Sequence, residues 1–70
     1  MLEKITPLLM ESDTTLDLHA RKLITARADL MQEKSFQGAY DIQKIENSIH
    51  FLQHQLCKLL RDLQAENPSL

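Results

Sequence analysis

The clearest pattern in the chain is a run of isoleucines and leucines in its second half, spaced alternately three and four residues apart. This spacing places every member on one narrow strip of an α-helix and repeats every seven residues, as in helices that pair with other helices. The strip therefore predicts a helix that must be covered by another helix. It has two rows, Ile42, Ile49, Leu56 and Leu63 in one and Ile45, Leu52 and Leu59 in the other.

A second helical pattern precedes this strip. Residues 12–15 read Ser-Asp-Thr-Thr and indicate a helix start, because Asp13 or Thr14 can accept hydrogen bonds from the first turn. We therefore expect helix one over about residues 13–34. Arg27 falls within its inward face, where a long arginine stem can lie along apolar surface. The other members of that face are Leu16, Ala20, Leu23, Ile24, Leu30 and Met31.

A break in both patterns separates the two helices. Lys34 suits the carboxyl end of helix one, and residues 35–38 contain a serine and the only glycine of the chain, which favour a turn. Helix two is expected over about residues 39–65 and is ended by Asn67-Pro68. Because the connection is short, the helices should be antiparallel neighbours. The sequence thus predicts an all-α fold, an antiparallel two-helix hairpin.

Residues 2–11 carry a shorter apolar pattern that leaves two structures open. Thr6-Pro7 can start a short helix, because threonine caps helices and proline suits the first helical position. The alternative is an extended N-terminal arm. On the expected bounds helix two is about 10 Å longer than helix one, so its last turns overhang. Either residues 2–11 fold back over these turns or a partner covers them.

Size and composition limit the classes of function. Seventy residues form at most one domain, 1–70, and a core this small commonly needs a partner. The single cysteine, Cys57, excludes an internal disulfide and fits a reducing compartment. The net charge is −2, and the basic residues are dispersed, unlike those of a nucleic-acid binder. Neither a signal peptide nor an apolar run of membrane-spanning length is recognised. We therefore expect a cytoplasmic protein with no membrane or nucleic-acid partner.

Little in the chain indicates chemistry. His50, His54 and Cys57 lie on one side of helix two, but three ligands from one helix do not easily complete a tetrahedral zinc shell. We interpret them as a polar flank and expect no metal and no cofactor. No serine has a convincing base and acid around it, and no glycine-rich phosphate loop is present. We do not expect an enzyme, and no catalytic residue is assigned.

Some apolar residues lie outside the two inward faces. Tyr40 and Phe51 are eleven residues apart, so they share a face of helix two about half a turn from the strip. Leu18 lies opposite the inward face of helix one. These residues predict a second contact surface, because rigid aromatic side chains are favoured at interfaces. The alternative is a set of scattered surface apolar residues, which are common.

The order of features along the chain has a counterpart in a known family. The chain has Leu2-Glu3 at its start, a first amphipathic helix whose residues 26–31 read Ala-Arg-Ala-Asp-Leu-Met, a short turn, and Tyr40 opening an Ile/Leu-rich helix. Over roughly residues 2–60, this organisation resembles that of the YscE/EscE-like proteins, the small co-chaperones of the bacterial type III secretion needle subunit.

The resemblance implies a function. Such proteins bind a larger, tetratricopeptide-like helical chaperone, and the pair holds the needle subunit unpolymerised in the bacterial cytoplasm until export. The small member mostly contacts and stabilises the larger chaperone. On this basis the expected partner-binding residues are Leu9, Leu16, Leu18, Tyr40, Phe51, Leu60 and Leu63.

Two other functions stay open. The needle subunit itself is a helical hairpin of similar length, although its turn usually carries proline and aspartate, which residues 34–38 lack. A homodimeric four-helix bundle, acting as an adaptor or regulator, would bury the strips of two copies without another protein. Filament formation by the pure protein would favour the needle subunit.

Overall fold

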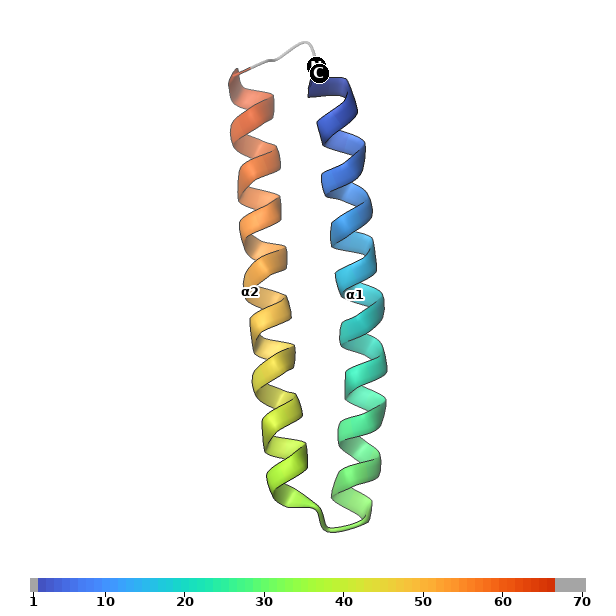
Figure 1. Cartoon of the computed structure of the whole chain (residues 1–70). Helices are drawn as coiled ribbons and strands as arrows, with labels where there is room; N and C mark the ends of the chain where they lie inside the picture. The colour runs from blue at the N-terminus through green and yellow to red at the C-terminus, as the bar shows by residue number, and fades with distance from the viewer. Residues whose placement is uncertain (1, 67–70) are drawn as a thin grey trace.

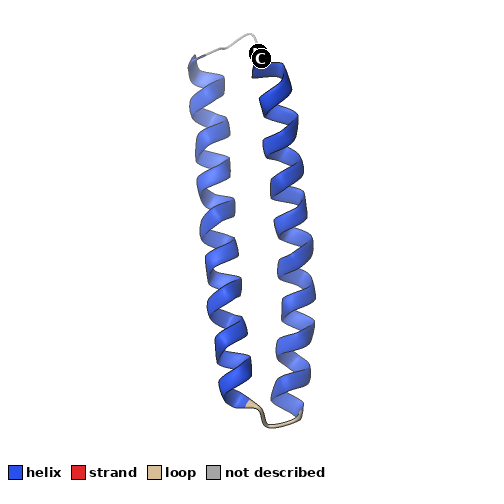
Figure 2. Cartoon of the chain, viewed as in Figure 1, coloured by secondary structure: helices blue, strands red, loops and turns tan. Residues whose placement is uncertain are grey.

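The protein is a hairpin of two long helices. The computed structural model describes residues 2–66, which form α1 (Leu2–Gln32) and α2 (Phe36–Glu66). The helices lie side by side and antiparallel (Figure 1), with only a short loop between them (Figure 2). The predicted all-α antiparallel hairpin is confirmed. Its principal extents are 52 × 15 × 12 Å, so the molecule is a thin rod.

Helix α1 starts earlier than the sequence pattern predicts. It begins at Leu2 and not near residue 13, so residues 2–11 are its first turns and no separate N-terminal helix or arm is found. Pro7 lies inside α1 and omits one hydrogen bond of these turns, because proline has no N–H. The two helices are equally long, 31 residues each, and the expected overhang of helix two is absent.

The polar residues that predicted a helix start are inside α1 instead. The hydroxyl of Ser12 donates to the carbonyl oxygen of Leu8 at 2.9 Å, and that of Thr14 to the carbonyl oxygen of Met10 at 3.1 Å. Both bonds run four residues back along the helix, which lets a short polar side chain sit within helical structure. The predicted helix start at Asp13 or Thr14 is therefore wrong, because these residues lie inside a continuous helix.

Helix α1 ends in a Schellman motif. The Ser35 N–H donates to the carbonyl oxygen of Leu30 at 2.8 Å, and the Lys34 N–H to that of Met31 at 3.1 Å. These are the two bonds that close this motif, and it requires a left-handed residue just past the helix. Lys34 is that residue, with φ of 61°. The chain reverses direction here.

The turn precedes the glycine that was expected to form it. Residues 33–35 connect the helices instead of 35–38, and the Ser35 carbonyl oxygen already accepts from the Ala39 N–H at 3.0 Å. Gly38 lies in the first turn of α2. A Cβ on Gly38 would lie 3.3 Å from Cδ1 of Leu30, so the missing side chain lets the two helices approach closely beside the turn. The stop of α2 expected at Asn67-Pro68 lies outside the described residues.

Two rows of side chains on each helix form the contact between α1 and α2, and each row repeats every seven residues. We call the first pair the apolar rows: Leu9, Leu16, Leu23 and Leu30 on α1, and Ile42, Ile49, Leu56 and Leu63 on α2. We call the second pair the mixed rows: Thr6, Asp13, Ala20 and Arg27 on α1, and Ala39, Glu46, Gln53 and Leu60 on α2. All are buried or half-buried, as expected for paired helices.

Only one of the two predicted rows of the α2 strip packs against α1. The other, Ile45, Leu52 and Leu59, is 50%, 49% and 43% exposed, and we call it the outer row. Helix α1 packs instead over the mixed row of α2, where Glu46 supplies an ion-pair partner and Ala39 is small. On α1, Ile24 and Met31 were also expected to face inward but are exposed.

The buried core is thin. The buried apolar residues within residues 2–66 are Ala20, Ala39 and Ile49, at 3%, 3% and 8% exposure. The helix pairing places Ala20 at the height of Ile49, so a small side chain meets a large one. The leucines of the apolar rows stay half-buried, because two helices cannot surround them. The fold therefore leaves much of its apolar surface in contact with water.

Candidate partner-binding surface

A two-point ion pair joins the mixed rows. Arg27 Nε donates to Glu46 Oε2 at 2.7 Å and Nη2 to Oε1 at 3.3 Å, the strong fork geometry of arginine and carboxylate. The Glu46 side chain is only 7% exposed and that of Arg27 is 35% exposed. The hydrogen bond to Glu46, and then its charge, raise the pKa of Arg27 above its usual value. This pair opposes sliding of one helix along the other, because sliding would strand a buried carboxylate.

A second polar contact lies further along the mixed rows. Gln53 Nε2 donates to the backbone oxygen of Asp13 at 3.5 Å, a long bond. Asp13 Oδ1 is buried and has no hydrogen-bond partner among the residues described. Buried polar groups without partners lower stability. The mixed rows thus combine polar contacts, which set how the helices align, with the closely packed Ala20 and Ala39.

The apolar and mixed rows face different sides of the hairpin. At 100° per residue, the apolar rows of both helices turn toward the outer row, and the mixed rows turn away from it. One side of the rod, which we call the open side, is therefore lined by the apolar rows and the outer row together. On α2 this side is apolar from Ile45 to Leu59, whereas the flanking row of α1 contains Ile5, Ser12, His19 and Ala26. The opposite side is interrupted by charged and amide groups.

The molecule exposes more area than a compact protein of its mass. The chain exposes 5485 Å² at a mass of 8.1 kDa. A compact monomer of that mass exposes about 4500 Å². The surplus of about 1000 Å² follows from the shape of a thin rod.

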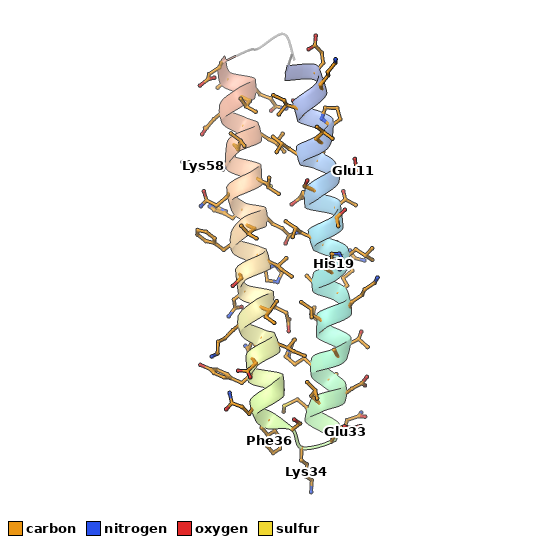
Figure 3. All side chains as sticks on the ribbon, viewed as in Figure 1. Glu11, His19, Glu33, Lys34, Phe36 and Lys58 are labelled. Atoms are coloured by element: carbon orange, nitrogen blue, oxygen red, sulfur yellow. The ribbon has the colours of Figure 1, made fainter. Side chains whose placement is uncertain are left out.

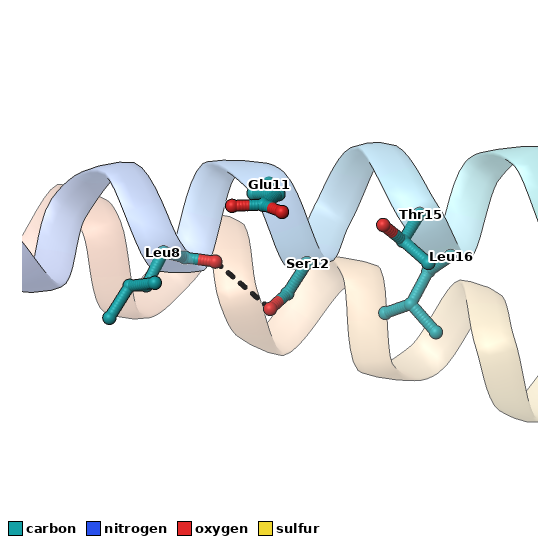
Figure 4. Close-up of a pocket in the computed structure, with 5 residues that line it drawn as sticks. All are labelled: Leu8, Glu11, Ser12, Thr15 and Leu16. Atoms are coloured by element: carbon teal, nitrogen blue, oxygen red, sulfur yellow. Dashed lines mark hydrogen bonds between the residues drawn. The ribbon is translucent and has the colours of Figure 1, made fainter.

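Two shallow depressions lie on the surface, one on each helix. One is lined by α1 residues alone, Leu8, Glu11, Ser12, Thr15 and Leu16 (Figure 4). The other is lined by α2 residues alone, Gln55, Lys58, Leu59 and Asp62. Each lies between side chains of a single helix, and the Ser12 hydroxyl already donates to the Leu8 carbonyl. These depressions suit the side chains of a docking helix better than a small molecule.

The predicted partner-binding residues fall in two places. Leu9, Leu16, Leu60 and Leu63 are half-buried between the helices. Leu18, Tyr40 and Phe51 are 51%, 56% and 62% exposed. The structure does not gather these last three, because Leu18 is on α1 and the other two are on α2. Their role in binding stays a prediction.

The outer row was not among the predicted contact residues. Sequence reasoning assigned the whole strip to a helix–helix contact and therefore counted Ile45, Leu52 and Leu59 as covered. A usable signal was present. Arg27 lies in the inward face of α1, and Glu46 in the mixed row of α2 can form an ion pair with it. This ion pair favours contact over the mixed row and leaves the outer row exposed.

The residues with metal-binding potential are dispersed. His50, His54 and Cys57 are all exposed, and His50 Nδ1 lies 3.2 Å from Gln53 Oε1. Within residues 2–66 no group of three histidine, cysteine or acidic side chains is arranged to hold a metal ion. Other polar side chains, such as Glu11 and His19 on α1 and Lys58 on α2, project from the surface (Figure 3).

Comparisons with known proteins leave the family open. No protein-family model, no curated protein and no solved structure matches the chain. In the part of the chain that the structure describes, neither helix has the length and apolar character needed to cross a membrane.

Proposed function

We propose that the chain is a small co-chaperone of the YscE/EscE-like kind. It binds and stabilises a larger tetratricopeptide-like chaperone and, through it, keeps the type III secretion needle subunit unpolymerised before export. The observation that carries the proposal is the open side, where the outer row of α2 and the half-buried apolar rows of both helices leave apolar surface exposed. The resemblance in chain organisation supplies the kind of partner.

The architecture of the proposed partner supports this choice. Tetratricopeptide-like proteins stack antiparallel helix pairs, and each pair buries its apolar face against the next. A separate hairpin with one apolar side can add to such a stack as a further pair. Both proteins then gain stability, because binding to the folded state shifts the unfolding equilibrium by mass action. A small protein with a thin core benefits most from such a partner.

The proposed site of action is the cytoplasm, where the needle subunit awaits export. The thiol of Cys57 is free and exposed, which fits a reducing compartment. The proposed function needs no catalytic group, metal or cofactor, since the work is done by surface complementarity.

The proposal is tested by purification of the tagged chain, under gentle conditions, from the cells that produce it. We expect a helical-repeat chaperone and a needle-like subunit to copurify, and both can be identified by mass spectrometry. Recovery of the chain only with itself would contradict the proposal and favour the homodimeric adaptor. Filaments formed by the pure protein would favour the needle subunit.

A further inference from the structure

We infer that the partner lays an amphipathic helix with basic flanks along the open side, over Ile45, Leu52 and Leu59. The inference rests on the proposed function, because it names the surface that this partner uses and the chemistry of the partner helix. Three observations support it: the open side continues the interface between α1 and α2, its edges carry more acidic than basic residues, and charged side chains interrupt the other exposed apolar positions.

The outer row continues the buried interface without a gap. Ile45, Leu52 and Leu59 alternate along α2 with the apolar row that packs on α1, and both rows are incompletely covered. A helix placed over the outer row would also cover the half-buried leucines beneath it. From Ile45 to Leu59 the row spans about 21 Å. A partner helix of about four turns is sufficient to cover it.

The edge of the open side carries more acidic than basic residues. The next row outward on α2 contains Asp41, Ser48, Gln55 and Asp62, and the matching row on α1 contains Leu8, Thr15, Lys22 and Asp29. Lys44 lies 3.8 Å from Asp41 and offsets part of that charge. Uncharged Ser48 and Gln55 border Leu52, so charge is kept to the ends of the surface. A partner helix with lysine or arginine beside its apolar row complements this edge.

The same edge disfavours a second copy of the chain. If two hairpins pair with their turns at the same end, Asp29 lies opposite Asp41 of the second copy. If their turns are at opposite ends and Leu52 is central, Asp41 lies opposite Asp62 of the second copy. Like charges that face each other across an interface weaken it. The open side therefore fits a different protein better than itself.

The remaining exposed apolar residues do not form a comparable surface. Lys44 Nζ lies 4.6 Å from the centre of the Tyr40 ring, so a charge already covers that aromatic. Phe51 has Lys44 and Lys58 seven residues to either side of it on α2. On the side opposite the outer row, Ile24 and Met31 belong to α1 and face polar positions of α2. Ile24 and Met31 do flank the buried interface, but Asp17 interrupts their row between Met10 and Ile24.

The test uses a synthetic peptide as the probe and two neighbouring residues of α2 as a matched pair. The peptide is a helix of about 28 residues with leucine at one seam position of each heptad, alanine at the other and lysine at the flanks. Binding to the purified full chain is followed by fluorescence anisotropy. Leu52→Asp should weaken binding at least about 30-fold. Phe51→Asp, one residue along the same helix, tests the aromatic surface expected from the sequence, and it should change peptide binding less than about twofold because the inferred site is the outer row.

Three controls make the result decisive. Circular dichroism should show unchanged helicity for Leu52→Asp, because that side chain is already half exposed, and Leu59→Asp provides a second variant of the outer row. A peptide with glutamate flanks should bind at least about tenfold more weakly at low salt. The difference between the two peptides should shrink as salt is added.

The outcomes separate the inference from the proposed function. A larger loss for Phe51→Asp than for Leu52→Asp, or no binding of the lysine peptide, would overturn the inference. A stable dimer of the pure chain that Leu52→Asp dissociates would assign the open side to a second copy and also overturn it. Failure to copurify a helical-repeat chaperone, with the peptide results as expected, would reject the proposed function alone.

Discussion

At the scale of single residues, the turn shows how the chain tolerates local strain. Lys34 adopts a left-handed conformation with φ of 61°, a region that side chains with a Cβ occupy at a cost of about 1 kcal/mol. The Schellman hydrogen bonds of Ser35 and Lys34 hold it there. The only glycine is used elsewhere, at Gly38, where closeness to Leu30 requires it.

Replacement of Lys34 by glycine should therefore stabilise the hairpin. We expect Lys34→Gly to raise the free energy of unfolding by about 0.5–1 kcal/mol, since glycine adopts a positive φ without strain. Urea denaturation followed by circular dichroism measures the change. Lys34→Ala keeps the Cβ and serves as the control, with no comparable gain. A loss of stability in Lys34→Gly would show that the lysine side chain contributes more than its strained backbone costs.

The Arg27–Glu46 pair should behave as a buried pair does. Arg27→Met leaves the Glu46 carboxylate buried without its partner and should lower the melting temperature. The double variant Arg27→Met/Glu46→Leu removes both charges and should restore the melting temperature to that of the wild type or above it. An Arg27→Met variant as stable as the wild type would show that the pair does not hold the helices together.

The pH dependence of this pair follows from the raised pKa of Arg27. A group whose pKa is raised in the folded state stabilises that state fully below its unfolded pKa and loses the effect as pH rises through the folded value. For an arginine this range is strongly alkaline. The charge of Arg27 therefore contributes throughout the neutral range, and any loss near neutral pH must have another source.

At the scale of the helices, the seven-residue repeat correctly predicted one of the two rows of α2 that contact α1, but not the second. The repeat predicted paired helices and the apolar row of α2, and the short connection predicted their antiparallel arrangement. The repeat favoured the wrong neighbour of that apolar row, because Ile45, Leu52 and Leu59 are more hydrophobic than Ala39, Glu46 and Gln53. In the structure α1 packs over the row of Ala39, Glu46 and Gln53. Glu46 pairs there with Arg27, and the small side chains of Ala20 and Ala39 let the helices approach closely.

The N-terminal boundary was missed for a related reason. Ser12, Asp13 and Thr14 are typical of helix starts, and sequence alone does not show that hydroxyls will bond backward within a continuous helix. Packing decides here: extension of α1 to Leu2 covers the last turns of α2, so tertiary contact overrides a local cap preference. The partner-binding surface was hidden by the same assumption that one helix would cover the whole strip.

Replacement of Asp13, in the mixed row of α1, should increase the stability of the hairpin. Its Oδ1 is buried without a partner in the structure described, so Asp13→Leu should stabilise the hairpin by about 1–2 kcal/mol. Thermal and urea unfolding measure this. Asp29→Leu, on the exposed surface of the same helix, is the control and should change stability by less than about 0.5 kcal/mol. A destabilised Asp13→Leu would indicate that the carboxylate has a stabilising contact.

At the scale of the whole molecule, the ratio of surface to core governs behaviour. Ala20, Ala39 and Ile49 are a small buried set for a rod 52 Å long. Apolar burial in such a molecule only slightly exceeds the conformational entropy lost on folding. The isolated chain should therefore have a small free energy of unfolding, and the chain bound to its partner should have a larger one.

Urea unfolding of the isolated chain should report this marginal stability. We expect a free energy of unfolding below about 5 kcal/mol. Measurements at two protein concentrations should agree, because a monomer unfolds independently of concentration. A midpoint that rises with concentration would reveal self-association and would contradict the inferred role of the acidic edge.

The division of the hairpin into an open side and a polar side also has an evolutionary consequence. If the partner uses the open side as inferred, substitutions at Phe51 lie outside the interface and should be nearly neutral. Substitutions at Ile45, Leu52 or Leu59 should be almost silent in the free chain but selected through the complex. Among orthologues, these exposed positions should therefore vary as slowly as buried Ile49, and substitutions at them should be matched by changes in another gene.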